Sequence, residues 1–338
     1  MINIVYRLKS PKFFEEAIDD IELNDVVVRP TYLSICQADQ RYYQGSRPPE
    51  ILSQKLPMAL IHEAVGEVVH DSKSIFNSGD KVVMIPNTPI GEDCYRANYS
   101  TLSKFRGSGF DGFTSDLVSL THDRLVKLPD NFDFEVSAFI ELMTVAYQGI
   151  MKFREFKKAS CKVLGVWGDG NLGYITSLIL KVLCPDCRVI VFGKHLENLN
   201  LFSFVDDAYM IHNVPDDLKI DHAFECVGSA ASQSAIDQII QLINPQGTIN
   251  LFGVSEYPIP INTRMILEKG LTLQGNSRSE REDFEGVVSL LKENPQLFSY
   301  LSKLITNVCE IKSIDDLKSA FDKDYISNFG KTILKWEI

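Results

Sequence analysis

The sequence predicts an α/β protein in which a β-rich domain is joined to a doubly wound parallel sheet. Three observations support this fold class. A glycine-rich turn at 168–173 follows one apolar strand-like run and opens an apolar helix-like run. From about residue 160 onward, strand and helix patterns alternate, which is typical of a parallel sheet covered by helices. Before residue 140 the apolar runs are short and separated by turn residues, which is typical of β-rich structure.

The composition is that of an ordinary globular protein. A length of 338 residues suggests about two domains, and 45% hydrophobic residues can fill their cores. The net charge of −11 repels nucleic acid and anionic membranes, so we expect neither as a partner. No run approaches the roughly 18 apolar residues of a membrane span, and no signal-like start is present, so we expect a cytoplasmic location. Seven scattered cysteines, an odd number, favour reduced thiols over a disulfide framework.

The amino-terminal part shows the β-rich pattern. Apolar runs at 25–30, 64–69 and 81–86 predict short strands. Residues 87–112 are polar and rich in turn residues, so we expect a long loop there. Helical spacing over 135–153 predicts the helix that links the two domains.

The later part of the chain carries the alternating pattern. The expected strands are 162–167, 188–192, 208–212, 221–226 and 247–252, and 232–243 is one of the helices between them. The tail returns to a mixed pattern, with a helix over 283–292 and a closing strand over 331–336. We expect this tail to pack back on the amino-terminal domain.

The glycine-rich turn predicts a dinucleotide site. Gly168 permits the tight turn, Gly170 lets a pyrophosphate approach the backbone, and Gly173 lets helix and strand pack closely. Asn171 and Leu172 begin the helix, whose first N–H groups and positive dipole end suit phosphates. The alternative is a plain strand–turn–helix packing motif, which would bind no ligand.

The residues after the second strand of this unit indicate which nicotinamide is bound. NAD sites usually carry an acidic residue about 20 positions after the glycine turn, where it bonds the ribose 2′-hydroxyl. Here the corresponding residues are Gly193 and Lys194, so no carboxylate opposes a 2′-phosphate and a cation is offered. We therefore expect NADP(H). The alternative is that Lys194 is a solvated loop charge and that both cofactors are accepted.

A metal site is indicated before the glycine turn. Cys36, His62, Glu63 and Glu141 supply the thiolate, imidazole and carboxylate groups that zinc accepts at a catalytic site. Their long spacing leaves a structural alternative open. Cys36 lies in an apolar run and could belong to the core, and His62 could be a buried histidine with ordinary hydrogen bonds.

The order of these motifs resembles the zinc-dependent medium-chain dehydrogenase/reductase family. The match includes Cys36-x-x-Asp39, His62-Glu63-Ala64-Val65-Gly66, Gly79-Asp80-Lys81-Val82, Glu141, the glycine turn and Glu225-Cys226-Val227-Gly228. The resemblance implies a GroES-like catalytic domain at 1–142, completed by 277–338, and a Rossmann domain at 143–276, with the active site in the cleft. It implies one catalytic zinc held by Cys36, His62 and Glu141. Glu63 is then a fourth ligand or a carboxylate that exchanges with water.

Two departures from the family pattern are informative. Many members bind a structural zinc through four closely spaced cysteines, but the corresponding loop here has one, Cys94, so we expect no structural zinc. Where polyol dehydrogenases usually have a serine and a histidine that relay the proton, this chain has Ala38 and Arg41. Water at the metal and Glu63 then become the expected proton route. Arg41 suggests an anionic substrate, because a guanidinium can hold a phosphate bidentately.

Several strings, among them Cys36 to Arg47, Leu52 to Met58 and Trp167 to Tyr174, resemble the bacterial ribulose-5-phosphate reductases more closely. That resemblance implies NADPH-dependent reduction of D-ribulose 5-phosphate to D-ribitol 5-phosphate. It also implies a homodimer and coupling to a cytidylyltransferase that makes CDP-ribitol for teichoic acid or capsule. Two alternatives remain: an NAD-linked zinc dehydrogenase of an unphosphorylated polyol or alcohol, and a non-catalytic binding member of the family. We expect neither a redox nor a metal role for the CxxC at 184–187.

Overall fold

The chain divides into two compact units. The computed structural model describes residues 2–21, 23, 25–91, 95–156, 161–327 and 329–338. Unit 1 comprises Met1–Thr144 and Arg278–Ile338, and unit 2 comprises Val145–Ser277. None of the helices described is long and apolar enough to cross a membrane.

Unit 1 is built on strands. Its strands are β1 Ile2–Ser10, β2 Phe13–Asp20, β3 Val26–Ser34, β4 Met58–Ala59, β5 Glu63–Asp71, β6 Lys81–Met84, β7 Asn87–Pro89, β8 Ser103–Phe105, β9 Val118–Leu120, β10 Leu125–Lys127, β17 Ile305–Ile311 and β18 Lys331–Trp336. Its helices are α1 Gln37–Tyr43, α2 Pro49–Lys55, α3 Phe134–Ser137, α9 Arg281–Glu293, α10 Leu297–Leu301 and α11 Ile314–Ile326, with short 3₁₀ turns at His122–Arg124 and Ser302–Leu304. The helix α4, Ile140–Phe156, begins in unit 1 and ends in unit 2.

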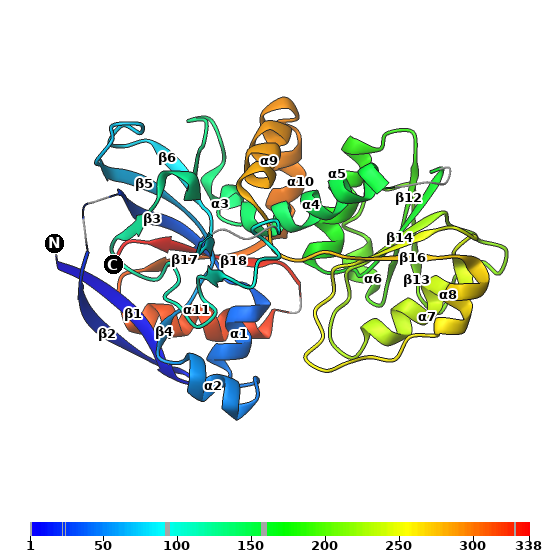
Figure 1. Cartoon of the computed structure of the whole chain (residues 1–338), viewed down its shortest axis with the longest axis horizontal. Helices are drawn as coiled ribbons and strands as arrows, with labels where there is room; N and C mark the ends of the chain where they lie inside the picture. Colours follow the sequence, from blue (N-terminus) through cyan, green and yellow to red (C-terminus); the bar gives the residue numbers. More distant parts are fainter. Residues whose placement is uncertain (1, 22, 24, 92–94, 157–160, 328) are drawn as a thin grey trace. The chain divides into compact units, whose positions relative to one another are not determined.

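The main sheet of unit 1 joins segments from both ends of the chain. Its order is β10-β6-β5-β3-β18-β17, and β9 pairs with β3. The closing strand β18 runs antiparallel to β3, with Ile333 opposite Ser34 (Figure 1). The expectation that the tail packs on the amino-terminal domain is therefore confirmed. Because these pairings join distant parts of the chain, β18 can bring a residue from near the carboxyl terminus beside residues of the amino-terminal strands.

The helix α1 is fixed against α11 by packing and by a buried amide. Tyr43 and Phe321 place their ring centroids 4.7 Å apart in the core. The Gln40 side chain donates to the Phe321 carbonyl oxygen at 2.7 Å and to Asp324 Oδ2 at 2.8 Å. Because a buried amide that keeps its partners is costly to move, these contacts hold α1 in a single place. The residue immediately before α1 is Cys36.

Unit 2 is a six-stranded parallel sheet with helices. Its elements are β11 Val163–Trp167, α5 Asn171–Leu183, β12 Arg188–Gly193, α6 Leu196–Leu199, β13 Asp207–Met210, β14 His222–Glu225, α7 Ser232–Leu242, β15 Thr248–Leu251, α8 Thr263–Lys269 and β16 Thr272–Gly275. The strand order is β13-β12-β11-β14-β15-β16, the doubly wound arrangement. Strand order reverses between β11 and β14, and ligands of such sheets bind at the carboxyl ends of the strands beside that point. The predicted strands of this region are all present, each within a residue or two.

Three features of unit 1 differ from the expectations. The stretch 87–112 includes the paired strands β7 and β8 and is not a continuous loop. The helix expected over 135–153 is two helices, α3 and α4, and Asp133 caps the start of the first by accepting a hydrogen bond from the Val136 N–H at 3.1 Å. The hairpin of β1 and β2 was not predicted, although residues 15 to 20 alternate between half-buried and exposed positions.

Candidate active site

The glycine-rich turn lies at the carboxyl end of β11. Gly168 has a φ of +123°, which favours glycine, and a Cβ there would lie 3.0 Å from the Cys226 backbone. Gly170 is the N-cap of α5, and none of the described atoms lies within 4 Å of a Cβ added to it. A Cβ on Gly173 would lie 1.9 Å from the Gly168 carbonyl oxygen. The third glycine is therefore required by packing, whereas the second leaves room for a ligand beside the first N–H groups of α5.

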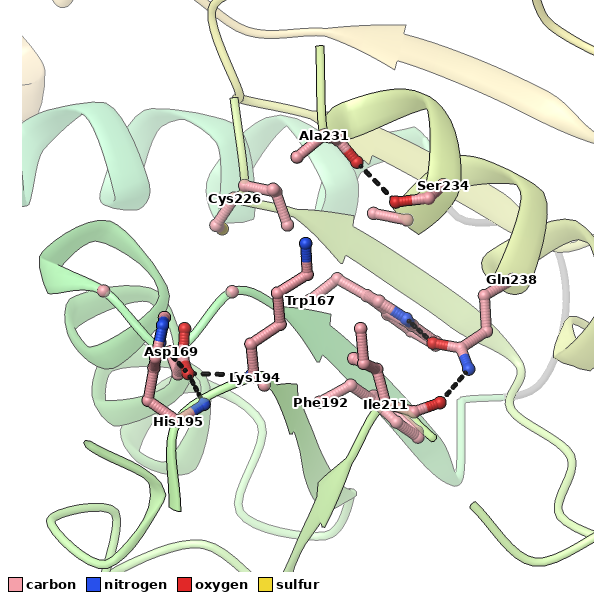
Figure 2. A pocket seen from close by; sticks show the side chains of 15 residues that line it. Trp167, Asp169, Phe192, Lys194, His195, Ile211, Cys226, Ala231, Ser234 and Gln238 are labelled. Atoms are coloured by element: carbon pink, nitrogen blue, oxygen red, sulfur yellow. Dashed lines mark hydrogen bonds and ion pairs between the residues drawn. The ribbon is translucent and has the colours of Figure 1, made fainter. Parts of the chain in front are cut away.

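A cavity of about 460 Å³ opens beside this turn, within unit 2 (Figure 2). Trp167 and Phe192 stack in its wall with ring centroids 3.9 Å apart. The Trp167 Nε1–H donates to Gln238 Oε1 at 2.8 Å, and Gln238 Nε2 donates to the Ile211 carbonyl oxygen at 2.7 Å. An apolar wall with a few fixed polar groups is typical of a pocket that binds a cofactor.

The turn after β12 presents basic side chains to this cavity. Asp169 Oδ2 accepts hydrogen bonds from the Lys194 N–H at 2.8 Å and the His195 N–H at 2.6 Å, and it lies 3.0 Å from His195 Nδ1. A Cβ on Gly193 would lie 2.6 Å from the Asp169 Cβ, so the glycine allows this approach. Figure 2 shows the Lys194 side chain extending into the pocket. Asp169 carries the one carboxylate among the side chains drawn in Figure 2, and its hydrogen bonds hold the turn that carries Lys194.

Alanine substitutions at Gly173 and Gly170 should separate folding from ligand binding. Gly173→Ala should lower the urea midpoint of unfolding, with a loss of about 1–3 kcal/mol, because the new methyl group overlaps a backbone oxygen. Gly170→Ala should leave the midpoint unchanged but weaken NADPH binding at least tenfold, since its methyl group occupies the space of the ligand. Quenching of Trp167 fluorescence measures the affinity. Equal stability of the two variants would contradict this interpretation of the turn.

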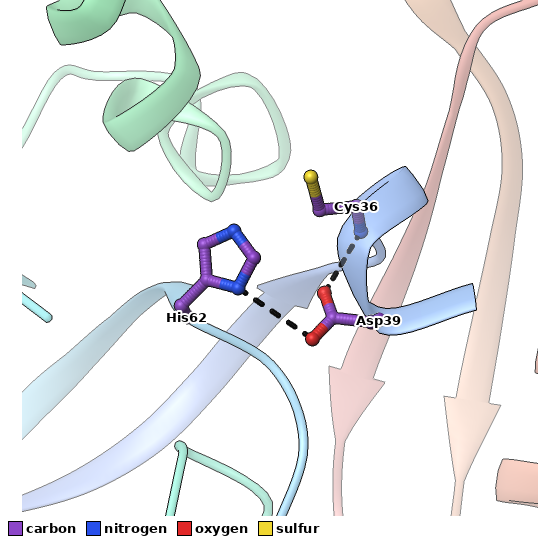
Figure 3. A group of neighbouring side chains, drawn as sticks. All are labelled: Cys36, Asp39 and His62. Carbon is purple, nitrogen blue, oxygen red and sulfur yellow. Dashed lines mark hydrogen bonds and ion pairs between the residues drawn. The ribbon is translucent and has the colours of Figure 1, made fainter. Parts of the chain in front are cut away.

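A cluster of potential metal ligands lies in unit 1. Atoms of Cys36, Asp39 and His62 lie within 4.8 Å of one another (Figure 3), and an overlapping group of the same size joins His62, Glu63 and Glu141. Cys36 is the N-cap residue of α1, and Glu141 lies in the first turn of α4. Glu63 is the first residue of β5, and His62 immediately precedes it. Cys36 is half-buried, and the other four side chains are buried.

Asp39 orients the histidine of this cluster. Its carboxylate accepts hydrogen bonds from the Cys36 N–H at 3.1 Å and the Ile61 N–H at 3.0 Å. His62 Nδ1 lies 3.5 Å from Asp39 Oδ1, which leaves Nε2 for a metal ion (Figure 3). Burial opposes a charge on His62, but Asp39 and Cys36 outweigh it and raise its pKa well above the usual value.

The cluster holds more acidic than basic groups. Burial raises the pKa of Glu141 to about 7; the positive charge of His62 opposes this rise, and the negative charge of Glu63 adds to it. A divalent cation would relieve this repulsion, and thiolate, imidazole and carboxylate are ligands that zinc accepts. The residues therefore fit a zinc ion.

A buried lysine partly balances these charges. Lys331 is 2% exposed, and its Nζ donates to Glu63 Oε1 at 3.0 Å and lies 2.7 Å from Oε2. It also donates to the Ile35 carbonyl oxygen at 2.9 Å. Burial opposes its charge, but Glu63 and Cys36 raise the pKa of Lys331, so the ammonium form is favoured. Lys331 thus fixes the orientation of Glu63 from β18.

Comparisons with known proteins decide the family. Residues 22–130 match the family model described as alcohol dehydrogenase GroES-like domain, and 180–293 match the one described as zinc-binding dehydrogenase. Ribulose-5-phosphate reductase 1 of Staphylococcus aureus is 51% identical, with 99% of each chain covered. The ribulose-5-phosphate reductase of Bacillus spizizenii is 49% identical, with 100% of each chain covered. The chain belongs to the zinc-binding dehydrogenase family.

Solved structures agree with this assignment. The crystal structure of S. aureus TarJ in complex with NADPH matches this chain with a TM-score of 0.91 and 48% identity, over 100% of both chains. Escherichia coli L-idonate 5-dehydrogenase, 21% identical with a TM-score of 0.85, shares the fold. The predicted fold class, a GroES-like domain with a Rossmann domain, is confirmed.

Four of the seven residues predicted for cofactor binding line one pocket of this zinc-binding dehydrogenase. Gly168, Gly170, Gly193 and Lys194 line the cavity, while Asn171, Leu172 and Gly173 form the first turn of α5. The four predicted metal ligands also lie together, as the two overlapping groups show.

The sequence predictions also rest on two other residues, Arg41 and Cys94. Arg41 is half-buried on α1 and lies two positions after Asp39, so the two side chains leave the helix about 160° apart. Cys94, on which the absence of a structural zinc was argued, lies outside the described residues.

The sequence interpretation missed three residues that support these sites. Asp39 carried a signal, because it stands three positions after Cys36 in the quoted motif, but it was given no role. Asp169 lies between two of the glycines and was likewise given no role. Lys331 carried a weaker signal, a cation at the start of an apolar strand whose neighbours are buried.

Proposed function

We propose that this zinc-binding dehydrogenase is a reductase that converts D-ribulose 5-phosphate to D-ribitol 5-phosphate with NADPH. The observation that carries the proposal is the full-length identity of 49–51% to proteins named ribulose-5-phosphate reductase. The TarJ structure, with bound NADPH and 48% identity, supports the choice of cofactor. The intact set of potential metal ligands argues against the non-catalytic alternative.

The proposal includes several finer assignments. Catalysis is assigned to 1–142 with 277–338, and cofactor binding to 143–276. One zinc ion per chain is held by Cys36, His62 and Glu141, without a second, structural zinc. We further propose a cytoplasmic homodimer whose product is consumed by a cytidylyltransferase that makes CDP-ribitol for teichoic acid or capsule.

The chain's own residues would hold the reactants and keep them dry. When bound, zinc supplies Lewis acidity that polarises the ketone oxygen, and NADPH supplies the hydride. Asp39 keeps the His62 ring oriented through Nδ1, and burial of the cluster excludes bulk water. We assign the proton route to water at the metal site together with Glu63, whose carboxylate is oriented by Lys331.

Two comparisons test the proposed activity. NADPH oxidation should be rapid with ribulose 5-phosphate and at least tenfold slower with ribulose, because a bound phosphate contributes charge-assisted hydrogen bonds. Removal of zinc with a chelator should abolish turnover, and added zinc should restore it. Faster turnover of an unphosphorylated polyol with NAD would favour the polyol dehydrogenase alternative. A protein that contains no zinc and turns over neither substrate would favour the binding-protein alternative.

Lys194→Glu should shift the cofactor preference toward NADH. The lysine side chain lines the pocket where the 2′-phosphate is expected, and the variant places a carboxylate there. Because a hydrogen bond to a charged group contributes about 1.5–3 kcal/mol, the KM for NADPH should rise about 10- to 100-fold, with little change for NADH. Lys219→Glu makes the same charge change at an exposed position and should alter neither value. An unchanged NADPH/NADH ratio in Lys194→Glu would reject the role.

Arg41→Ala should raise the KM for ribulose 5-phosphate at least tenfold, while zinc content stays constant. The phosphate is three carbons from the reacting carbonyl, so its cation need not lie beside the metal ligands. Turnover of unphosphorylated ribulose is the internal control and should not change. A similar loss with both substrates would show that Arg41 supports the fold or the metal site and not the phosphate.

A further inference from the structure

Two cysteines lie together at the amino ends of β11 and β12, and both are thiols in this structure. Cys161 Sγ and Cys187 Sγ are 2.9 Å apart, and the Cys187 thiol donates to the Cys161 carbonyl oxygen at 3.2 Å. We propose that Cys161 and Cys187 are a redox modification site, which a hydroperoxide converts to a disulfide. An S–S bond is about 2.05 Å long, so the sulfurs need to approach by less than about 1 Å.

The backbone that follows each cysteine is held in place. The Arg188 N–H donates to the Lys162 carbonyl oxygen at 2.7 Å, which continues the β11–β12 ladder toward the cysteines. Asp221 Oδ2 accepts hydrogen bonds from the N–H groups of Lys162 at 2.9 Å and Val163 at 3.0 Å. The thiols are therefore kept near each other by the sheet, and the encounter needs no rearrangement of the fold.

The CxxC at 184–187 does not by itself predict this pair. The Cys187 N–H donates to the Cys184 carbonyl oxygen at 3.0 Å, which closes the turn after α5. The thiol of Cys187 is nevertheless placed against Cys161, which lies 26 positions earlier in the chain. Cys184 is buried and is the competing partner that an experiment must exclude.

The proposed oxidation balances with a hydroperoxide as the oxidant. The half-buried Cys161 is the accessible thiol; its thiolate attacks an oxygen of hydrogen peroxide, the O–O bond breaks, and a sulfenic acid and hydroxide form. The hydroxide takes up the proton that the thiol released and leaves as water. The Cys187 thiolate then attacks the sulfenic sulfur, so the S–S bond forms and the S–OH bond breaks. The released hydroxide takes up a proton and leaves as a second water. The two thiols lose two electrons, and the peroxide is reduced.

The bond would stabilise unit 2 without blocking the pocket. It would close the segment 161–187, which contains the glycine-rich turn and α5. Both cysteines precede their strands, whereas the pocket lies at the carboxyl ends of the same strands. Since a disulfide restricts the unfolded chain, oxidation should raise the melting temperature by several degrees. The Kd for NADPH should stay within about twofold.

Peptide mapping tests the proposal. The zinc-loaded full-length protein is treated with hydrogen peroxide, its remaining thiols are alkylated, and a non-reduced digest is analysed by mass spectrometry. We expect a Cys161–Cys187 cross-link that is lost in C161S and in C187S and kept in C184S. The melting temperature of the wild type should rise with peroxide and fall back with dithiothreitol, and that of C161S should not respond.

Three results would overturn the proposal. The first is the absence of a cross-link at peroxide doses that oxidise other thiols. The second is a cross-link from Cys184 to Cys161 or Cys187 in place of the expected one, and the third is the loss of the Cys161–Cys187 cross-link in C184S. If C187S fails to fold, the wild type and the C161S variant decide the question, because Cys161 is only half-buried. The test does not depend on the proposed activity, because the cross-link is detected by mass spectrometry and not by turnover.

Discussion

Cys36→Ser should lose bound zinc and lower kcat/KM for ribulose 5-phosphate by at least about 10³-fold. A serine hydroxyl does not ionise near neutral pH, so the cluster loses an anionic sulfur ligand that zinc favours. Lewis-acid polarisation of a carbonyl contributes several kcal/mol to the transition state, and each 1.36 kcal/mol is tenfold in rate. Zinc content by mass spectrometry and NADPH oxidation measure the two effects.

The matched control is Cys309→Ser, in β17 of the same unit. Cys309 is half-buried and packs against the unit 1 core, so its replacement should leave zinc content and kcat/KM unchanged. Zinc added to chelated wild type should restore activity, whereas zinc added to Cys36→Ser should not. A Cys36→Ser protein that keeps one zinc per chain and wild-type turnover would exclude Cys36 as a ligand.

The parallel sheet and its cofactor turn could be predicted because their signals are local. Buried strands of unit 2 read as continuous apolar runs, and the glycines stand at fixed spacing in the turn between β11 and α5. The metal ligands could be proposed from residue types and from the family resemblance. Residue types alone left the core alternative for Cys36 and His62 open, since no local spacing distinguishes a ligand from a core residue.

The contacts that support these sites depend on pairing between distant segments. Lys331 and Glu63 are 268 positions apart and meet because β18 pairs with β3, which in turn pairs with β5. Cys161 and Cys187 meet because the ladder of β11 and β12 sets their register. Sequence periodicity gives the face of a strand but not its neighbour, so neither pair could be derived from it.

Lys331→Met should be the most destabilising single charge change in unit 1. Glu63 is fully buried, and without the ammonium group it would be a buried charge without its ion-pair partner. Breaking a buried ion pair from one side costs about 3–5 kcal/mol. The loss should be largest in the zinc-free protein and smaller in the zinc-loaded protein, because the ion supplies a compensating charge beside Glu63. Urea unfolding with and without chelator measures both values.

Two controls separate charge from packing. The double variant Glu63→Gln/Lys331→Met removes both charges and should recover most of the stability, since the remaining loss is that of neutral hydrogen bonds. Lys335→Met lies on the same strand but pairs with Glu310 and Glu337 at the surface, and its urea midpoint should hardly change. If the double variant is no more stable than Lys331→Met, the stabilisation by Lys331 comes from the packing of its side chain and from its bond to Ile35. An equal loss with and without zinc would show that Glu63 and the ion are not electrostatically coupled.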